Sequence, residues 1–289
     1  YFSAIQDCES LEEMMPHLLL TVYHATKNSG PVTENAAQKL AEATSAEYYF
    51  FNVDEVLQGY HDLVEGSLGR KLAWETDDLA LQNIQARVRA PGVWMLSNVR
   101  GALLLTTSNR SEAAVGYATM DGDTSGGLCP LGGVDKTFLR SWLRHAEKSA
   151  FGVLPALPAL SLVNEQEPTA ELRPQGSLQK DEEDLMPYEV LDFIEKASIR
   201  DKRSPRDIFY LLQQEYSEIN KEQIFTWLTK FCQLWSRNQW KRERYAPSFH
   251  MDDENLDPKT WCRFPILSGS YIYELKCLRE ELNLEQTNG

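Results

Sequence analysis

The chain has 289 residues, a hydrophobic content of 42% and a formal net charge of −14 at pH 7. This length suits one large domain or two small ones, and the composition is that of an ordinary globular core. The negative charge argues against a general nucleic-acid surface and against binding to a membrane, and no apolar run reaches the roughly 18 residues of a membrane span.

Five cysteines and five histidines are spread along the sequence without the spacing of a metal site. No two cysteines form a CxxC pair, and their odd number favours the reduced thiols of a cytoplasmic protein. The histidines show neither HxH nor HExxH spacing, which argues against a transition-metal site. The chain starts at Tyr1 and not at a methionine, so we expect it to be part of a longer protein.

Two short apolar runs with a helical pattern between them open the chain. Residues 18–23 and 47–53 are predicted strands. Residues 32–44 carry apolar side chains at the spacing of one helix face, with Thr33 as the expected N-cap. A strand, a helix and a strand at this spacing predict a βαβ unit with parallel strands and a right-handed crossover.

A third apolar run, residues 102–105, is typical of a buried strand in a parallel sheet. Small polar residues follow it and lead into a helical pattern that starts at Ser111. In open α/β sheets ligands bind outside the carboxyl ends of the strands, and a helix N-terminus there suits phosphate. Residues 122–133 are rich in glycine, so the backbone can approach a ligand closely.

The remaining pattern is mostly helical. Further helices are predicted at 54–68, 79–89 and 137–149, with a loop at 69–78 and with Pro91 ending or kinking the second helix. From Pro187 on, helices are predicted at 188–197, 205–216 and 221–244 and near 271–282. The sequence therefore predicts an α/β nucleotide-binding core, a parallel sheet with helices on both faces, in residues 1–175. An all-helical extension is expected in residues 176–289.

Several polar side chains have both a structural and a functional interpretation. Thr107 either caps a helix or contacts a ligand. Glu112, three residues after Asn109, is either the carboxylate of a capping box or an oxygen ligand for Mg²⁺. Lys136 opens a helix, where its charge opposes the helix dipole, so it is either a solvated lysine or a phosphate contact.

Other candidates have equally open interpretations. Asn83 and Arg87 are four residues apart and share a helix face, which suits a bound carboxylate or phosphate as well as solvent. On periodicity alone Thr169 is a helix cap, Lys241 a solvated helix end and Tyr117 a packing residue.

Four motifs, in order along the chain, resemble the synthetase domain of the glutamine-dependent NAD synthetases. They are LQNIQARVRAP at 81–91, TSNRSEAAVGYATMDGD with PLGGVDK within 107–136, PTAELRP at 168–174 and NQWKRERYAP at 238–247. The resemblance implies a fold of the ATP-pyrophosphatase type whose C-terminal helices complete the site. It also implies ATP-dependent amidation of deamido-NAD to NAD through an adenylated nicotinate, with ammonia from glutamine.

The resemblance implies roles for particular residues as well. The ATP contacts that it implies are Thr107, Lys136 and Thr169. The deamido-NAD contacts that it implies are Asn83, Arg87, Glu112, Tyr117 and Lys241. Lys136 would also act catalytically by stabilising phosphate charge. Glu112 would bind either the dinucleotide or the metal ion, Mg²⁺.

Two parts of the family pattern are not found in this sequence. The SGGxDS loop is missing, because the SGG at 125–127 continues as Leu-Cys, and so is the glutaminase domain. We expect both to lie before Tyr1 in a longer chain, and we expect a homodimer or a larger homo-oligomer. Two alternatives stay open: a non-catalytic nucleotide-binding or dimerisation module, and another ATP-pyrophosphatase ligase, such as a tRNA-modifying or GMP-forming enzyme.

Overall fold

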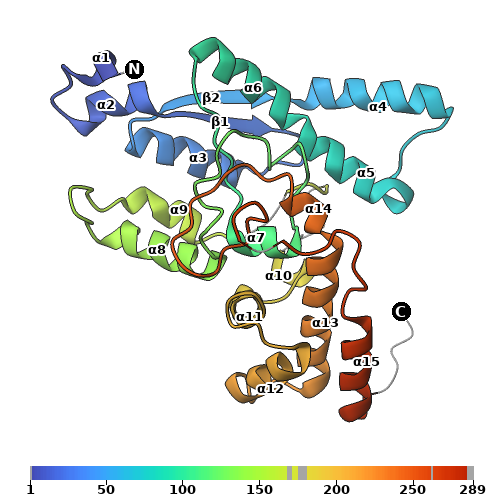
Figure 1. Ribbon diagram of the computed structural model, residues 1–289. Helices are drawn as coiled ribbons and strands as arrows, with labels where there is room; N and C mark the ends of the chain where they lie inside the picture. Colours follow the sequence, from blue (N-terminus) through green and yellow to red (C-terminus); the bar gives the residue numbers. More distant parts are fainter. Residues whose placement is uncertain (1, 168–170, 175–180, 262, 285–289) are drawn as a thin grey trace. The chain divides into compact units, whose positions relative to one another are not determined.

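The computed structural model of the chain describes residues 2–167, 171–174, 181–261 and 263–284 (Figure 1). Its internal contacts divide it into two compact units. The first unit consists of Tyr1–Arg100 with Arg140–Lys180, and the second of Gly101–Leu139 with Asp181–Gly289. The two units thus interleave along the sequence, and the functional boundary expected near residue 175 stays a prediction.

The first unit contains the βαβ arrangement expected from the sequence. Strands β1 (Leu20–Ala25) and β2 (Glu47–Asn52) run parallel and pair in register over all six residues of each. Helix α3 (Pro31–Ala43) connects them and packs on both strands. The predicted parallel βαβ unit is confirmed.

The N-cap of helix α3 lies three residues before the expected one. Its N-cap is Gly30, and Pro31 supplies the first helical position, where a fixed φ is suitable and no N–H is needed. The Thr33 hydroxyl lies inside the helix and donates to the Gly30 carbonyl at 2.9 Å. Thr33 as the N-cap was therefore wrong, because a proline at N1 determines where the helix starts.

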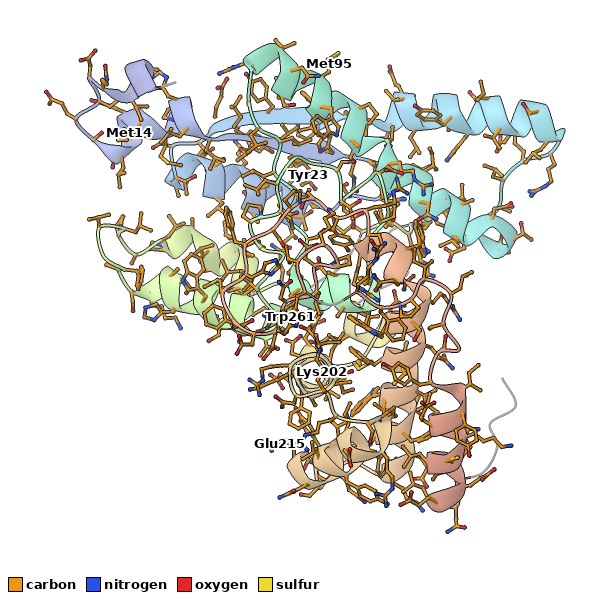
Figure 2. All side chains as sticks on the ribbon, viewed as in Figure 1. Met14, Tyr23, Met95, Lys202, Glu215 and Trp261 are labelled. Atoms are coloured by element: carbon orange, nitrogen blue, oxygen red, sulfur yellow. The ribbon has the colours of Figure 1, made fainter. Side chains whose placement is uncertain are left out.

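Helix α6 (Arg89–Arg100) lies on the opposite side of the two strands from α3 (Figure 1). At its start Gly92 lies against the ring of Phe51. At its end Arg100 forms an ion pair with Glu47 at 2.6 Å. Met95 is on the outer side of the helix and is 68% exposed (Figure 2). Helices thus cover both faces of the parallel sheet, as predicted.

Helix α4 (Asp54–Leu68) has the bounds predicted from the sequence and ends at Gly69, whose φ of 67° is left-handed. The loop expected at 69–78 is shorter, because α5 (Trp74–Arg87) starts inside it. Asp77 stabilises that start by accepting a hydrogen bond from the Ala73 N–H at 3.0 Å. Pro91 neither ends nor kinks α5, since it lies in the first turn of α6, where its missing N–H costs nothing.

The remaining helices of the first unit are short, apart from α8. They are α1 (Phe2–Ile5), α2 (Leu11–Leu18), the 3₁₀-helix η1 (Pro158–Leu160) and α9 (Ser161–Asn164). Helix α8 (Lys136–Lys148) is predicted correctly to within a residue at each end, and its first four residues belong to the second unit.

The buried strand predicted at residues 102–105 does not form. Only Leu105 makes a single parallel bridge, with Leu128. Leu103 and Leu105 are 63% and 43% exposed, so the expected burial was wrong as well. A strand needs a neighbour for its N–H and C=O groups, and the described residues of the second unit form no sheet that could provide one.

The second unit is helical, as predicted for the C-terminal part of the chain. Its core consists of buried side chains from most of its helices and includes Ile194, Phe209 and Leu228. The predicted helix at 221–244 is interrupted at Asn238, where α13 ends. The helices are α7 (Arg110–Val115), α10 (Asp181–Asp184), α11 (Tyr188–Glu195), the π-helix η2 (Lys196–Arg200), α12 (Pro205–Glu215), α13 (Lys221–Arg237), α14 (Gln239–Arg242) and α15 (Ile272–Glu281).

Among the described residues, no helix is long and apolar enough to cross a membrane. The described cysteines, which are Cys8, Cys129, Cys232 and Cys277, are free thiols.

Candidate functional site

The start of α7 is built by the capping box that the sequence predicts. The Asn109 side chain accepts a hydrogen bond from the Glu112 N–H at 3.0 Å, and Glu112 Oε2 accepts one from the Asn109 N–H at 3.3 Å. This reciprocal pair satisfies two N–H groups that a helix start leaves without partners. Only one oxygen of Glu112 is used in this way. The other oxygen, Oε1, lies 2.9 Å from the Lys136 ammonium.

Lys136 is held in place through its backbone. Its N–H donates to Ser111 Oγ at 2.8 Å, so α7 fixes the first residue of α8. The next N–H, that of Thr137, donates to Asp192 on α11 at 3.1 Å. The ammonium lies 5.4 Å from the centre of the Tyr188 ring. Three helices therefore position a lysine whose side chain is 18% exposed.

Two tyrosines of the second unit donate hydrogen bonds to acids on α10. The Tyr117 hydroxyl donates to Asp184 and the Tyr188 hydroxyl donates to Asp181, each at 3.1 Å. Burial raises the pKa of both tyrosines, and the neighbouring carboxylates raise it further. Both hydroxyls therefore stay protonated at neutral pH and act as donors.

Side chains of α14 and of Asn238, the residue between α13 and α14, satisfy the carbonyl groups at the end of α7. Lys241 Nζ donates to the carbonyls of Gly116 and Ala118, each at 2.7 Å. Asn238 and Arg242 donate in the same way to Val115 and Ala114. In this structure Lys241 thus has backbone partners, which fixes where its charge lies, and its contact with a dinucleotide stays a prediction.

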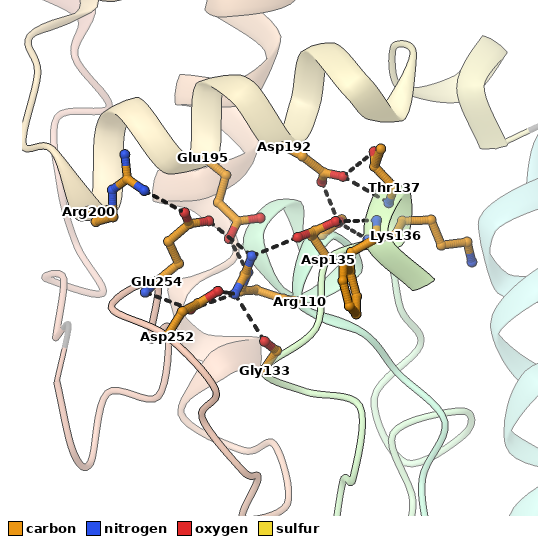
Figure 3. A network of polar contacts seen from close by, with 12 residues as sticks. Arg110, Gly133, Asp135, Lys136, Thr137, Asp192, Glu195, Arg200, Asp252 and Glu254 are labelled. Atoms are coloured by element: carbon orange, nitrogen blue, oxygen red, sulfur yellow. Dashed lines mark hydrogen bonds and ion pairs between the residues drawn. The ribbon is translucent and has the colours of Figure 1, made fainter. Parts of the chain in front are cut away.

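Arg110 is the most heavily engaged side chain near this site (Figure 3). It is 2% exposed and lies within 3.0 Å of four carboxylates: Asp135 at 3.0 Å, Glu195 at 2.8 Å, Asp252 at 2.9 Å and Glu254 at 3.0 Å. These groups come from the segment before α8, from α11 and from the segment after α14. One guanidinium therefore joins three parts of the second unit.

The carboxylates around Arg110 carry more charge than it can compensate. Glu195 is fully buried, and burial raises its pKa well above the ordinary range although Arg110 opposes this. Arg200 adds a second, more distant cation at 3.4 Å from Glu254. Figure 3 shows the Lys136 side chain pointing away from this cluster. Arg110 therefore contacts the segment before α8 and does not contact the Lys136 ammonium.

Two of the recognised motifs meet within the first unit. Gln85, from the motif at 81–91, donates to the Glu171 carbonyl at 2.9 Å, and Glu171 belongs to the motif at 168–174. Gln85 also accepts from Asn28 at 2.7 Å, and Asn28 follows β1. On the same helix Asp78 forms an ion pair with Arg173 at 2.8 Å. Segments separated by more than 80 residues thus converge at the carboxyl end of β1.

Comparison with known proteins identifies the family. The family model described as NAD synthase matches residues 11–244. The chain belongs to the NAD synthase family. The resemblance expected from the four motifs is confirmed.

Relatives of this NAD synthase family chain are longer than the chain itself. It is 32% identical to a glutamine-dependent NAD(+) synthetase of Aquifex aeolicus, over 71% of the chain and 34% of that protein. For the Rattus norvegicus protein of that name the identity is 29%, over 93% of the chain and 39% of the relative. The crystal structure of a glutamine-dependent NAD(+) synthetase from Cytophaga hutchinsonii is 46% identical in sequence and superposes with a TM-score of 0.82. The match covers 96% of the present chain and 44% of the Cytophaga chain. The chain thus spans less than half of each.

The structure places the predicted site residues of this member of the NAD synthase family in different surroundings. In the second unit Glu112 contacts Lys136 directly, whereas Thr107 is exposed. In the first unit Asn83 is half-buried and Arg87 is exposed on α5. Tyr117 and Lys241 take the partners given above, and Thr169 lies outside the described residues. The roles of all these residues stay predictions.

The sequence did not single out three residues that lie near Glu112 and Lys136: Arg110, Asp192 and Asp181. Arg110 lies inside the recognised TSNRSE motif, but a lone arginine between small polar residues gives no sign of burial. Asp192 shares one face of α11 with Tyr188 and Glu195, at a spacing that could have indicated a polar stripe. Asp181 belongs to the acidic run DEED at 181–184, in which nothing in the sequence indicates that one acid is buried.

Proposed function

We propose that this chain carries the ligase part of an enzyme that amidates deamido-NAD to NAD with ATP. The carrying observation is the contact between Glu112 and Lys136, which brings together two ends of the recognised motif that are 24 residues apart. The names of the relatives support a ligase of this kind. A glutaminase domain of the longer protein as ammonia source, a homo-oligomer and a cytoplasmic location belong to the same proposal.

The reaction proceeds in two steps. The nicotinate carboxylate of deamido-NAD attacks the α-phosphate of ATP, and pyrophosphate leaves. Ammonia then displaces AMP from the acyl-adenylate and forms the amide. Adenylation is needed because a free carboxylate is a poor electrophile. Positioning of the reactants and stabilisation of phosphate charge supply most of the rate.

Each substrate has a group of candidate contacts. For ATP they are Thr107, Lys136 and Thr169, with the Lys136 ammonium stabilising phosphate charge as pyrophosphate leaves. For deamido-NAD they are Asn83, Arg87, Tyr117 and Lys241, and Glu112 if it does not hold the metal. The Tyr117 hydroxyl and the Asn83 amide would orient deamido-NAD through hydrogen bonds. The cations Arg87 and Lys241 would bind its phosphate or carboxylate groups.

Glu112 is the residue that would hold Mg²⁺. Its Oε1 already faces a cation, the Lys136 ammonium, and a carboxylate is a donor that Mg²⁺ prefers. The described residues contain no group of three or more histidines, cysteines and acids that could hold a metal ion. One carboxylate fits a Mg²⁺ that completes its shell with water and substrate phosphates. When bound, Mg²⁺ would neutralise phosphate charge.

Formation of NAD by the full-length protein from deamido-NAD, ATP-Mg²⁺ and ammonium tests the proposal. We expect Lys136→Met to lower kcat by about 10²-fold or more, as the loss of a charge-stabilising group does elsewhere. The matched control is Lys148→Met, an exposed lysine at the other end of α8, which should leave kcat unchanged. Absence of NAD from the unmodified protein would refute the proposal.

A further inference from the structure

Tyr188 is a buried residue to which the proposed function assigns no role. It is the first residue of α11, directly after Pro187, and it is 1% exposed. Its hydroxyl donates to Asp181 at 3.1 Å, so the ring is held at both ends. Burial raises the pKa of this hydroxyl, and the carboxylates of Asp181 and Glu112 raise it further. The ring is therefore that of a neutral phenol at neutral pH.

The face of this ring meets the Lys136 ammonium. Nζ lies 5.4 Å from the ring centre, within the roughly 6 Å over which the negative face of an aromatic ring attracts a cation. The Lys136 side chain is 18% exposed, so little water screens the contact. A lysine side chain is a flexible stem with a point charge at its end. The fixed ring therefore restricts where that charge lies.

Glu112 and Tyr188 hold the same ammonium in different ways. The Glu112 carboxylate, at 2.9 Å, carries a full negative charge that compensates the charge of the ammonium. A neutral ring has a quadrupole but no net charge, so an ammonium that faces it keeps its whole charge. The attraction between the ammonium and a phosphate grows with that charge. Of these two partners, the ring is the one that leaves Lys136 able to stabilise phosphate.

The proposed function engages the carboxylate but not the ring. In either role considered for Glu112, as a ligand of Mg²⁺ or as a contact to the dinucleotide, its carboxylate is taken by another group and is no longer free to pair with Lys136. The single proton of the Tyr188 hydroxyl is already donated to Asp181, and the buried ring has no room to leave its place. The ring is thus the partner that Lys136 keeps when the substrates bind.

We propose that Tyr188 is a positioning residue, whose ring holds the Lys136 ammonium for the phosphates of ATP and leaves its charge uncompensated. This inference rests on the proposed function, in which Lys136 contacts ATP. Tyr188 acts through Lys136 and touches no substrate itself. Its effect on ATP binding must therefore depend on the ring and not on the hydroxyl, and it must disappear when the lysine is absent.

The affinity of the full-length protein for ATP-Mg²⁺, measured by calorimetry without deamido-NAD so that no reaction occurs, tests this role. Tyr188→Leu removes the ring and should weaken ATP binding by about 10-fold, the size of a cation–ring contact shielded from water. Tyr188→Phe keeps the face of the ring and should bind ATP within about twofold of the unmodified protein. Phe209→Leu is the matched control, because it removes another fully buried ring, on α12, and should leave the affinity unchanged.

A double-mutant cycle separates positioning from a loss of structure. Tyr188→Leu combined with Lys136→Met should bind ATP as Lys136→Met alone does, because the ammonium on which the ring acts is gone. Fluorine atoms on the ring of Tyr188→Phe give a second readout, since they withdraw electrons from the face of the ring and change its size little. Successive fluorine atoms should weaken ATP binding step by step. A ring that only fills the core would move neither comparison.

Three results would overturn the inference while leaving the proposed function intact. Tyr188→Phe could weaken ATP binding as much as Tyr188→Leu, which would place the effect in the hydroxyl. Tyr188→Leu could cost the same affinity with and without Lys136, so that the ring would act through the fold. Tyr188→Leu could also bind ATP as the unmodified protein does. Unchanged ATP affinity in Lys136→Met is a different outcome, because it would contradict the role of Lys136 in the proposed function itself.

Discussion

Glu195 is a carboxylate that shares one guanidinium with three others and has no access to water. Arg110 carries a single charge, so it cannot keep all four acids ionised, and burial penalises the charged form of Glu195 most. We therefore expect Glu195 to hold a proton in the folded protein at neutral pH. In the unfolded chain it would ionise with its ordinary pKa of about 4.3.

This raised pKa predicts how stability depends on pH. Because the folded state binds the extra proton, the stabilisation is fully present below about pH 4.3 and is lost as the pH rises through the folded pKa. Glu195→Gln cannot ionise and escapes this loss. Relative to the variant, the unmodified protein should lose up to about 1.4 kcal/mol of unfolding free energy per pH unit above that value.

Urea unfolding of both proteins across the pH range measures this difference. The control is Glu189→Gln, since Glu189 is an exposed acid on the same helix and should give parallel curves. The other acids that face Glu195 are Asp135, Asp192 and Glu254, and both proteins contain them. A difference that is independent of pH would show that Glu195 is ionised when folded.

Arg110 itself predicts a contrast between a buried and an exposed ion pair. Its removal leaves buried acids without a cation, so Arg110→Ala should lower the unfolding free energy by about 3–5 kcal/mol. Arg206→Ala is the comparison: its pair with Glu281 has a similar distance of 2.7 Å, but the Arg206 side chain is 60% exposed. That loss should be at most about 1 kcal/mol. Equal losses in the two variants would contradict the role of burial.

At the scale of elements, the end of α7 depends on a close approach between Gly116 and the side chain of Asn238. Gly116 has a φ of 65°, and a Cβ added there would overlap Asn238 Cβ and lie 2.7 Å from its Cγ. Gly116→Ala should therefore combine backbone strain with displacement of a side chain that binds the Val115 carbonyl. We expect a loss of about 3 kcal/mol or more in unfolding free energy.

Gly69→Ala separates the two contributions. Gly69 ends α4 with a nearly identical φ of 67°, but nothing lies within 4 Å of the position that a Cβ would take. Its replacement costs the strain alone, about 1 kcal/mol. Denaturant unfolding of the two variants therefore measures the clash as their difference. If the two variants lose the same unfolding free energy, the contact with Asn238 does not contribute to the loss in Gly116→Ala.

The elements that were predicted correctly are those that local pattern determines. The boundaries of α4 follow from its periodicity, and the start of α7 follows from the capping box of Asn109 and Glu112. The strand expected at residues 102–105 fails because an apolar run can form a strand only beside another strand. The start of α3 differs for a local reason as well, since Pro31 outweighs Thr33.

At the scale of the whole molecule, the site depends on partners that are distant in sequence. Family resemblance indicated Glu112 and Lys136, and the structure brings them to 2.9 Å. No pattern could show that Arg110 is buried among acids as far away as Glu254, because its neighbours in sequence are small and polar. Asp181 was missed for the same reason, since its burial comes from packing and not from the acidic run around it.

The last prediction concerns which ligands stabilise the fold. A ligand that binds only the folded state adds about 2.7 kcal/mol at a hundred times its Kd. ATP-Mg²⁺ and deamido-NAD should therefore each raise the midpoint of thermal unfolding of the full-length protein by several degrees. With Lys136→Met the shift with ATP-Mg²⁺ should shrink, while Lys148→Met, at the exposed end of the same helix, should keep it. Scanning fluorimetry measures all of these shifts. Protection by a purine nucleotide monophosphate or by tRNA, without protection by deamido-NAD, would instead favour another ligase of the ATP-pyrophosphatase type.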